Sequence, residues 1–412
     1  MPDRQLAPPS LPADTRVSPI PTDSTAPSHA RREWIHLHIG FVVVGIVTTL
    51  IGNVLPTFIR HWSLSDSQAG FLIAAQFTGS SLATFLTGVF LPRFGFARVL
   101  CAGFLCFAAG FSFFGLGPWF LAALAVFVYG FGYGLINPAA NLRGTQLPSK
   151  NVASAVTLLN FSWTIGAVGC PFVVAQSLPR VGVRGIAFAL VVVSLVVAVF
   201  HFSRHSSSPE RVSERPTRPV SEWLHHLEQV PFVSLFLIFF LYVGTEVGTG
   251  GWVATQEKRL PGGAATMLLL APSFFYGLLL FGRAISPLLL RHFSTVLISL
   301  AGLASAALGS LIIMFAHQPH WLYLGAAFAG LGCAPQYPIF VTWLAQTFGK
   351  NATWLSALFF GGAGVGGAVL PWMMGIVGAQ TGSLRLGFVL PLMACLVMMF
   401  LALRSHPRSR AS

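Results

Sequence analysis

The sequence predicts an all-α membrane protein with twelve transmembrane helices, arranged as two pseudo-symmetric bundles of six. Three observations lead to this prediction. Hydrophobic residues make up 54% of the 412 residues and charged residues only 8%, whereas a soluble domain carries about 25% charged residues. Twelve segments are long and apolar enough to cross a bilayer. The two halves of the chain also repeat each other at a fixed offset.

The predicted helices follow one another with short connections. A helix needs about 20 apolar residues to cross the hydrocarbon core. Glycine, which occurs 42 times in the chain, suits close helix packing in lipid. The first six helices are expected at 35–59, 68–91, 96–116, 118–142, 152–176 and 182–202, and the second six at 231–255, 264–288, 294–316, 320–347, 352–378 and 384–403.

Polar segments mark the domain boundaries. Residues 1–33 are rich in Pro, Ser and Thr and lack the apolar core of a signal peptide. We therefore expect a disordered cytoplasmic tail there and a polar cytoplasmic linker between the two bundles. The expected domains are 1–33 (tail), 34–203 (N-terminal bundle), 204–229 (linker), 230–404 (C-terminal bundle) and 405–412 (tail).

The distribution of Lys and Arg predicts the orientation. With both termini in the cytoplasm, 18 of the 24 basic residues fall on or near the cytoplasmic side, as the positive-inside rule requires. The net charge of +13 belongs to helix ends and tails, not to a basic domain that would bind nucleic acid. We expect a multi-pass protein of the cell membrane. The six exceptions are Arg60, Arg180, Arg184, Lys258, Arg259 and Arg385.

An internal repeat relates the halves at an offset of 200 residues. The run from Asn151 to Pro171 aligns without a gap with the run from Asn351 to Pro371. Two similar six-helix halves can rock about a site at the bilayer midplane and expose it to each side in turn. The repeat therefore favours transport over reception or catalysis. Further matched pairs are Gly130 with Gly330, Gly132 with Gly332, Pro138 with Pro338, Gln146 with Gln346 and Gly166 with Gly366.

One carboxylate lies inside a predicted membrane-spanning helix, where a charged group is energetically unfavourable. Of the eleven acidic residues, only Glu246 lies well inside a predicted helix, and none of the twelve histidines lies as deep. An ionisable residue inside a span is a functional hypothesis by default. We predict that Glu246 is the ion-coupling residue. The alternative is a carboxyl held by a neighbouring helix for structure alone.

Polar and aromatic side chains inside the predicted helices are the candidates for binding a substrate. Asn137 and Asn141 are four residues apart and share a helix face. Amides offer both donors and acceptors, as a polyol requires, although they can also hold helices together. The full candidate set is Asn53, Gln76, Asn137, Asn141, Asn160, Trp163, Trp252, Tyr276, Gln336 and Tyr337.

A Gly- and Arg-containing turn is expected after the second helix, in the segment GVFLPRFGFAR. Its residues Gly88, Arg93, Gly95 and Arg98 resemble the loop signature of the major facilitator superfamily, whose acidic position is Pro92 here. We predict a gating loop. The corresponding segment after the eighth helix, GRAISPLLLRHFS, keeps Gly282, Arg283, Pro287 and Arg291.

Taken together, these segments resemble the branch of the superfamily that contains fucose–, galactose– and glucose–proton symporters and sodium-dependent glucose transporters. The resemblance is closest at LSDSQAG, GFGYGLINPAAN, LLNFSWTIGAVGCP, YVGTEVGTGGW and QYPIF. It implies uptake of a monosaccharide driven by a proton or sodium gradient. The carboxylates that the branch carries in helices one and four are replaced by Gly52, Asn53, Leu135 and Asn137. Coupling then rests on Glu246, or the protein is a facilitator.

Other functions remain as alternatives. Within transport, the alternative is a facilitator or an exporter of another small amphipathic compound. A non-transporting membrane sensor is the remote alternative, because the polar segments are too short to fold alone. No residue pattern of an enzyme, a metal site or a cofactor site is present, and the five cysteines lie in apolar runs. We expect a monomer without a cofactor, with a sugar, an ion and the lipid bilayer as its partners.

Overall fold

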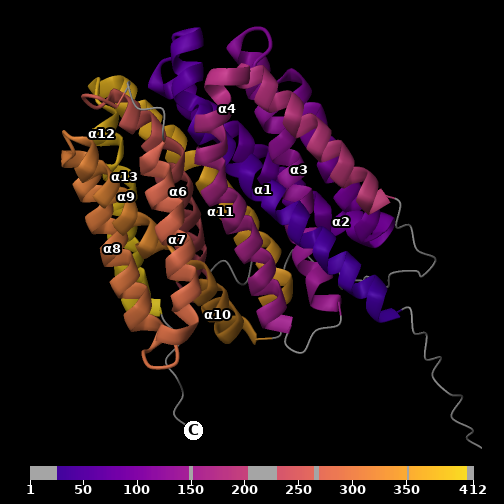
Figure 1. The fold of residues 1–412 in the computed structure, drawn as a ribbon. Coiled ribbons are helices and arrows are strands. Elements are labelled where there is room, and N and C mark those ends of the chain that lie inside the picture. The colour runs from indigo at the N-terminus through magenta and orange to yellow at the C-terminus, as the bar shows by residue number, and fades with distance from the viewer. Residues whose placement is uncertain (1–25, 148–151, 203–229, 264–268, 350–351, 406–412) are drawn as a thin grey trace, which may run out of the picture.

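The computed structural model describes residues 26–147, 152–202, 230–263, 269–349 and 352–405, and within these ranges it contains helices and turns but no strand (Figure 1). Among the described residues, ten helical segments are long and apolar enough to cross a membrane, and two of them, Pro319–Phe348 and Leu384–Arg404, each contain two shorter helices. Large apolar side chains point outward from them, among them Phe120, Phe188 and Phe315, which are 63%, 70% and 68% exposed. Apolar surface on this scale requires lipid around it. The chain is therefore a multi-pass α-helical membrane protein.

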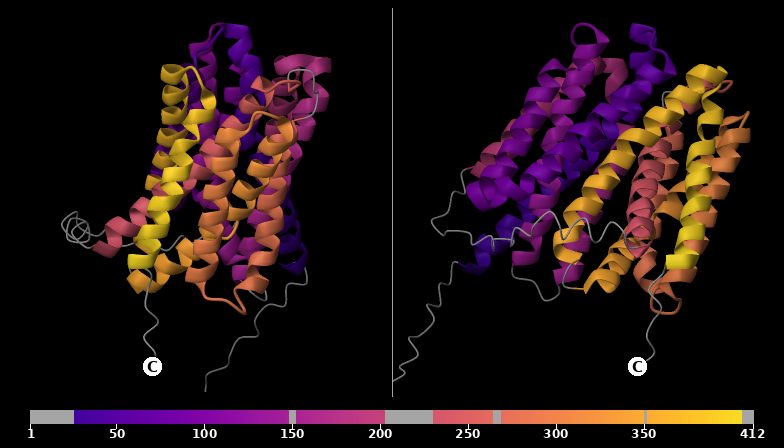
Figure 2. Two further views of the ribbon diagram at one scale, coloured as in Figure 1. Left: turned by 90° about the vertical axis from the view of Figure 1, so that its left-hand side faces the viewer. Right: turned by 180° about the vertical axis from the view of Figure 1, so that it is seen from behind.

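The helices form two groups in chain order (Figures 1 and 2). The first group packs mainly on itself and forms the N-terminal bundle; the second forms the C-terminal bundle. The first consists of α1 (Ala26–Trp62), α2 (Asp66–Phe113), α3 (Trp119–Gln146) and α4 (Val152–Phe202). The second consists of α6 (Val230–Arg259), α7 (Leu270–Leu289), α8 (Thr295–Phe315), α9 (Pro319–Cys333), α10 (Gln336–Phe348), α11 (Ala352–Thr381), α12 (Leu384–Gly387) and α13 (Val389–Ser405).

Helix α2 contains two of the predicted helices, joined by a reversal at Gly95 instead of a loop. This glycine has φ +78° and ψ 167°, a conformation that residues with a Cβ rarely adopt. Both arms of α2 lie against the same part of α3. A Cβ on Gly130 would lie 2.1 Å from the backbone oxygen of Gln76, and one on Gly132 would lie 2.5 Å from that of Gly103. The arms therefore fold back side by side.

Helix α4 turns back in the same way at Gly182, which has φ +65° and ψ −177°. The first arm meets α1 where a Cβ on Gly45 would lie 2.0 Å from the backbone oxygen of Trp163. The second arm meets α1 nearby, where a Cβ on Gly40 would lie 3.8 Å from Nε2 of His201. Because α2 and α4 each supply two arms, the arrangement agrees with twelve predicted membrane-crossing segments.

Other boundaries differ from the sequence prediction. The helix predicted at 320–347 is broken between α9 and α10, where Pro335 has no backbone N–H to donate. The helix predicted at 384–403 is divided between α12 and α13. Helix α1 begins at Ala26, inside the expected tail. The rest of that tail, the expected linker at 204–229 and residues 406–412 lie outside the described residues.

The internal repeat reappears as equivalent contacts. Gly166 on α4 packs against α1, where a Cβ would lie 2.0 Å from the backbone oxygen of Val42. Its partner in the repeat, Gly366 on α11, packs against α6, where a Cβ would lie 1.9 Å from the backbone oxygen of Phe240. Each glycine thus lets two backbones approach closely at the same place in its own bundle. The two bundles share one internal plan.

The bundles meet along three helix pairs, α1 with α6, α2 with α11 and α4 with α7. We call the face with the start of α1 and the end of α13 the terminal face, and the other the opposite face. At the opposite face, Arg259 donates to both carboxylate oxygens of Asp66, with Nη1 at 2.8 Å from Oδ2. Gly375 of α11 packs directly on the backbone of Asp66. This face is closed between the bundles.

Candidate functional site

Two opposite charges lie near the middle of the helices at the bundle interface. Glu246 is about 24 Å along α6 from its start at Val230, by the rise of an α-helix. Its carboxylate accepts a hydrogen bond from the Tyr242 hydroxyl, and it lies 3.5 Å from Nη2 of Arg283. The two charged side chains are only 14% and 21% exposed. The pairing lowers the cost of burying each charge.

Arg283 lies inside α7, about 20 Å from its first residue. The sequence pattern predicts a loop after the eighth helix at this position, and that prediction is wrong. The glycine, proline and arginine pattern around it matches a loop signature, and this match favours a loop over a position inside the span. The position inside the span is still readable, because the predicted span ends five residues after Arg283. The structure therefore adds an intramembrane cation that is not among the predicted site residues.

Arg283 connects the two bundles. Its Nη1 donates to Oγ1 of Thr164 on α4 at 3.1 Å, and its guanidinium lies 5.3 Å from the ring centroid of Trp163. A cation over an indole ring is attracted by the ring quadrupole. Trp163 is fixed in turn, because its Nε1 donates to Oγ1 of Thr48 at 3.0 Å. A group carried by the C-terminal bundle is thus held by side chains of the N-terminal bundle.

One tyrosine hydroxyl, that of Tyr242, contacts this charge pair, and further tyrosines lie near it. Four of the six tyrosines in the chain lie within electrostatic range of Glu246, and they come from four different helices. A phenolic hydroxyl both donates and accepts, so it can bind a hydroxylated ligand or relay a proton. Two of them, Tyr276 and Tyr337, belong to the predicted set. The four are Tyr133 on α3, Tyr242 on α6, Tyr276 on α7 and Tyr337 on α10.

Three predicted amides form a chain between α3 and α4. Asn160 Nδ2 donates to Asn141 Oδ1 at 2.8 Å, and Asn141 Nδ2 donates to Asn137 Oδ1 at 3.0 Å. All three side chains are partly exposed. The Asn137 amide nitrogen makes no hydrogen bond among the described residues, so its donors are available to a ligand. The structure brings these residues together, and the bridge from Asn160 also holds two helices together.

The two predicted glutamines lie inside the bundles instead. Gln76 is fully buried; its Nε2 donates to the Thr48 carbonyl at 3.0 Å and its Oε1 accepts from the Tyr129 hydroxyl at 3.3 Å. Gln336 is also fully buried and exchanges hydrogen bonds with Ser299, at 2.8 and 3.1 Å. Buried amides satisfied in this way join neighbouring helices. The hydrogen bonds of both glutamines favour a role in holding helices together over a role in substrate binding.

The remaining candidates have mixed surroundings. Asn53 is buried and donates to Cys170 Sγ at 3.5 Å, while its Oδ1 has no partner among the described residues. Trp252 is fully buried, and its Nε1 donates to the Pro371 carbonyl at 2.8 Å, so it joins α6 to α11. Tyr337 is the most open, with 36% of its surface exposed. The structure thus places Tyr337 as the accessible aromatic of the set.

The predicted gating loop is helical on both sides of Gly95. Gly88 lies within α2 and has open space where a Cβ would be. Arg93 and Arg98 are exposed on the two arms, and the Arg93 guanidinium lies 5.5 Å from the ring centroid of Phe94. The expected loop is therefore a single-residue reversal. Its role in gating stays a prediction.

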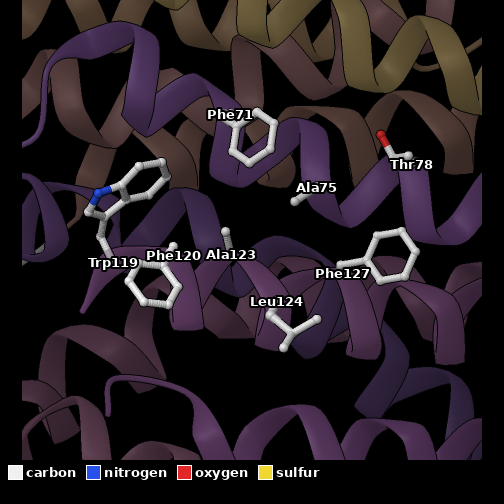
Figure 3. Close-up of a pocket in the computed structure, with 8 residues that line it drawn as sticks. All are labelled: Phe71, Ala75, Thr78, Trp119, Phe120, Ala123, Leu124 and Phe127. Atoms are coloured by element: carbon white, nitrogen blue, oxygen red, sulfur yellow. The ribbon is translucent and has the colours of Figure 1, made fainter. Parts of the chain in front are cut away.

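A groove on the outside of the N-terminal bundle lies apart from all these residues. It has a volume of about 320 Å³ and is bounded by α2 and α3 (Figure 3). Its lining is apolar apart from the Thr78 hydroxyl and the Trp119 indole nitrogen, so it suits a lipid chain better than a polyol. Within the described ranges, no three His, Cys, Asp or Glu side chains are grouped to hold a metal ion. The interface around Glu246 and Arg283 is therefore the candidate site.

Comparison with known proteins identifies the family. The model of the Major Facilitator Superfamily matches residues 37–352. Sodium-dependent glucose transporter 1 of Xenopus laevis is 23% identical over 78% of this chain and 71% of its own length. The glucose/mannose transporter GlcP of Bacillus subtilis is 21% identical over 81% of this chain and 85% of its own length. An uncharacterized transporter of Enterobacter sp. is 34% identical, but the match spans 19% of that protein.

Solved structures agree with this fold. The E. coli fucose:proton symporter superposes with a TM-score of 0.65 over 92% of this chain and 100% of that chain, at 17% identity. The nucleoside transporter NupG superposes with a TM-score of 0.73 over 90% of this chain and 99% of that chain, at 12% identity. At such identities the likeness concerns the fold alone. The sequence relatives named as glucose and glucose/mannose transporters confirm the predicted resemblance to the sugar symporter branch.

Proposed function

This chain belongs to the major facilitator superfamily, and from this premise we propose that it moves a monosaccharide across the cell membrane by alternating access, coupled to a proton or sodium gradient. The observation that carries the proposal is the placement of Glu246 and Arg283. They form a buried charge pair near mid-span, and Thr164 of the other bundle contacts it. Rocking of the bundles must change those contacts, so ion and substrate binding there can be linked to the motion.

The polar groups around the pair support a sugar as the substrate. The amide chain of Asn137, Asn141 and Asn160 offers donors and acceptors, and Tyr337 and Trp163 offer aromatic faces. Relatives named as glucose and glucose/mannose transporters are compatible with this choice. We propose the same site for the coupling ion, with Glu246 as its ligand or proton acceptor.

The proposed orientation places both termini in the cytoplasm, in accordance with the distribution of basic residues. The terminal face is then cytoplasmic, and the ion pair between Asp66 and Arg259 closes the outer face. The two bundles are the moving bodies of the proposed cycle, with the boundaries expected from the sequence. In this arrangement the site would exchange its ligand with the cytoplasm.

A passive facilitator is the second candidate, and one observation favours it. The resemblance to the branch places a carboxylate in helix one, just before the Leu-Pro pair where this chain has Gly52 and Asn53, and an acid in helix four where it has Leu135 or Asn137. If Glu246 is purely structural, no other acid in the described spans lies near mid-depth to couple an ion. An exporter of an amphipathic compound remains the further alternative within transport. The next experiment separates a coupled carrier from a facilitator.

The test is Glu246→Gln in proteoliposomes. We expect the variant to lose uphill accumulation of its sugar while keeping sugar exchange, because the amide fills the same space but cannot bind and release a proton. Glu33→Gln, which breaks the pair between Glu33 and Arg143 inside the N-terminal bundle, is the matched control and should keep accumulation. Normal uphill uptake by Glu246→Gln would remove this residue from coupling and favour another mechanism.

A further inference from the structure

The charges at the site restrict the kind of sugar that can be coupled to a proton. The argument rests on the proposed function, because it assumes that Glu246 carries the proton and that the substrate binds beside it. In the described part of the membrane-spanning helices, the charged groups near mid-depth are Glu246 and Arg283. When both are ionised, the site has no net charge.

Each combination of ligand and proton gives a different charge. A neutral sugar with a proton on Glu246 leaves the guanidinium of Arg283 buried without a counter-ion, which is costly in a low-dielectric site. A negatively charged sugar bound to the ionised pair leaves one excess negative charge. A proton on Glu246 together with a sugar that carries one carboxylate restores neutrality. Only this combination adds a proton and a substrate to the site without an uncompensated charge.

The geometry of Arg283 also suits a carboxylate ligand. Its distance to Glu246 is 3.5 Å, longer than the roughly 2.7–2.9 Å of a strong charge-assisted hydrogen bond. Glu246 has a closer partner in the Tyr242 hydroxyl. A guanidinium has five N–H donors in a planar fork, and its contacts to Glu246, Thr164 and Tyr242 occupy only part of them. The fork can therefore accept a second carboxylate once Glu246 is neutral.

The other titratable groups around Glu246 do not alter this charge balance. They are the four tyrosines named above, from α3, α6, α7 and α10, and the thiol of Cys333 on α9. All are neutral in their ordinary protonated form. The contacts from α4 come from Thr164 and Trp163, which do not titrate. The site can thus take up a charge only through Glu246, Arg283 and the ligand.

We infer that the coupled substrate is an acidic monosaccharide, a uronate or an aldonate, whose carboxylate binds Arg283 while Glu246 holds the co-transported proton. Arg283 is then the residue that determines substrate class. Asn137, Asn141 and the tyrosines bind the hydroxyl groups. One anion and one proton move together, so the loaded step transfers no net charge.

The first test uses the unmodified protein in proteoliposomes with D-glucuronate and D-glucose as probes. We expect a proton gradient to drive D-glucuronate uptake, and an imposed membrane potential to leave its rate unchanged. Uphill, proton-driven uptake of D-glucose without uptake of D-glucuronate, D-galacturonate or D-gluconate would overturn the inference and leave the proposed function intact. If none of these sugars or sugar acids is transported or shifts the melting temperature, the proposed function fails as well.

The second test uses variants of Arg283. Arg283→Gln should weaken D-glucuronate binding roughly 10- to 100-fold, the value of a charge-assisted hydrogen bond. Arg283→Lys keeps the positive charge but loses the planar set of N–H donors. Its affinity for D-glucuronate should therefore lie between those of the unmodified protein and Arg283→Gln. Glu246→Gln should bind D-glucuronate without dependence on pH. Arg404→Gln, on an exposed arginine that stacks on Phe400, is the control and should bind as the unmodified protein does.

Unchanged D-glucuronate affinity in Arg283→Gln would overturn the inference. If Arg283→Gln does not fold, Arg283→Lys and the response of the unmodified protein to membrane potential decide the question. Uptake of D-glucuronate that an imposed potential accelerates or slows would contradict electroneutral transport and count against the assignment.

Discussion

At the scale of single residues, the candidate site centres on Glu246 and Arg283, whose side chains are 14% and 21% exposed. Glu246 could be found because acids are scarce in the predicted spans, and the structure places it in a buried charge pair. Gln76 and Gln336 looked equally promising, yet both point into their own bundles. The direction in which a helix face points depends on how the helices pack. One sequence does not contain that information.

The amide chain of Asn137, Asn141 and Asn160 also depends on how helices pack. Asn137 and Asn141 were expected on one helix face because they are four residues apart. The bridge from Asn160 on α4 depends on the packing of two helices, which residue spacing does not reveal. Arg283 is absent from the predicted site for a different reason: the residues around it match a loop signature, although its position lies inside the predicted span.

We predict that Asn141→Ala weakens binding of the transported sugar about 5- to 30-fold, in proportion to the loss of one or two hydrogen bonds of about 1 kcal/mol each. The change removes the link from Asn137 to Asn160. The measurement is the dissociation constant from ligand-induced thermal shifts. Gln380→Ala, at an exposed amide near the end of α11, serves as the control. An unchanged constant for Asn141→Ala would exclude this residue from the binding site.

At the scale of helices, the sequence predicted where the apolar segments lie and how they repeat. It did not predict the form of their connections. A glycine between two apolar runs is compatible with a loop, a kink or a full reversal, and packing of both arms on α3 selects the reversal at Gly95. The break between α9 and α10 follows from Pro335. The sequence shows that this residue lacks a backbone N–H, but it does not show whether the helix bends or breaks there.

The close helix contacts predict a difference between glycines. A Cβ on Gly366 would lie 1.9 Å from the backbone oxygen of Phe240, so Gly366→Ala must push α11 away from α6. We expect this change to cost about 1–3 kcal/mol, typical of overpacking. Gly277→Ala is the matched control, because a Cβ there meets nothing within 4 Å. It should be neutral or stabilise α7 by up to about 1 kcal/mol.

Thermal unfolding in one detergent measures both variants. A lower midpoint is expected for Gly366→Ala and an equal or higher one for Gly277→Ala. Equal midpoints for the two variants would mean that the contact between α6 and α11 is looser than described.

At the scale of the whole molecule, two bundles meet along three helix pairs and are held together at the opposite face. The ion pair between Asp66 and Arg259 joins α2 to α6 across the interface, with the Asp66 side chain only 9% exposed. Nothing in the sequence indicates this pair, because Asp66 lies just before the helix predicted at 68–91 and Arg259 is only one of the six basic residues on the non-cytoplasmic side. Their pairing depends on how the two bundles sit together, which the internal repeat alone does not specify.

We predict that Asp66→Asn separates the bundles at this face by removing a bidentate, mostly buried partner of Arg259. The loss is worth about 1–3 kcal/mol, enough to raise a minor open population by roughly tenfold. Spin labels at Phe120 and Phe315, both exposed and both near the opposite face, report the distance between bundles. Glu33→Gln breaks a pair within one bundle and should leave the distance distribution unchanged. The same unchanged distribution in Asp66→Asn would show that other contacts hold this face closed.

The two reversals also determine the kind of bilayer in which this protein fits. Each lies between exposed arginines, Arg93 and Arg98 around Gly95, and Arg180 and Arg184 around Gly182. The guanidinium groups of arginine are most stable at the lipid–water boundary. They therefore anchor the reversal at Gly95 at one boundary and the reversal at Gly182 at the other. The arm of α2 after Gly95 has 18 residues and spans about 27 Å, a height that matches hydrocarbon cores of ordinary thickness. Lipids with much longer acyl chains would force the N-terminal bundle to tilt, and transport assays belong in bilayers that match this height.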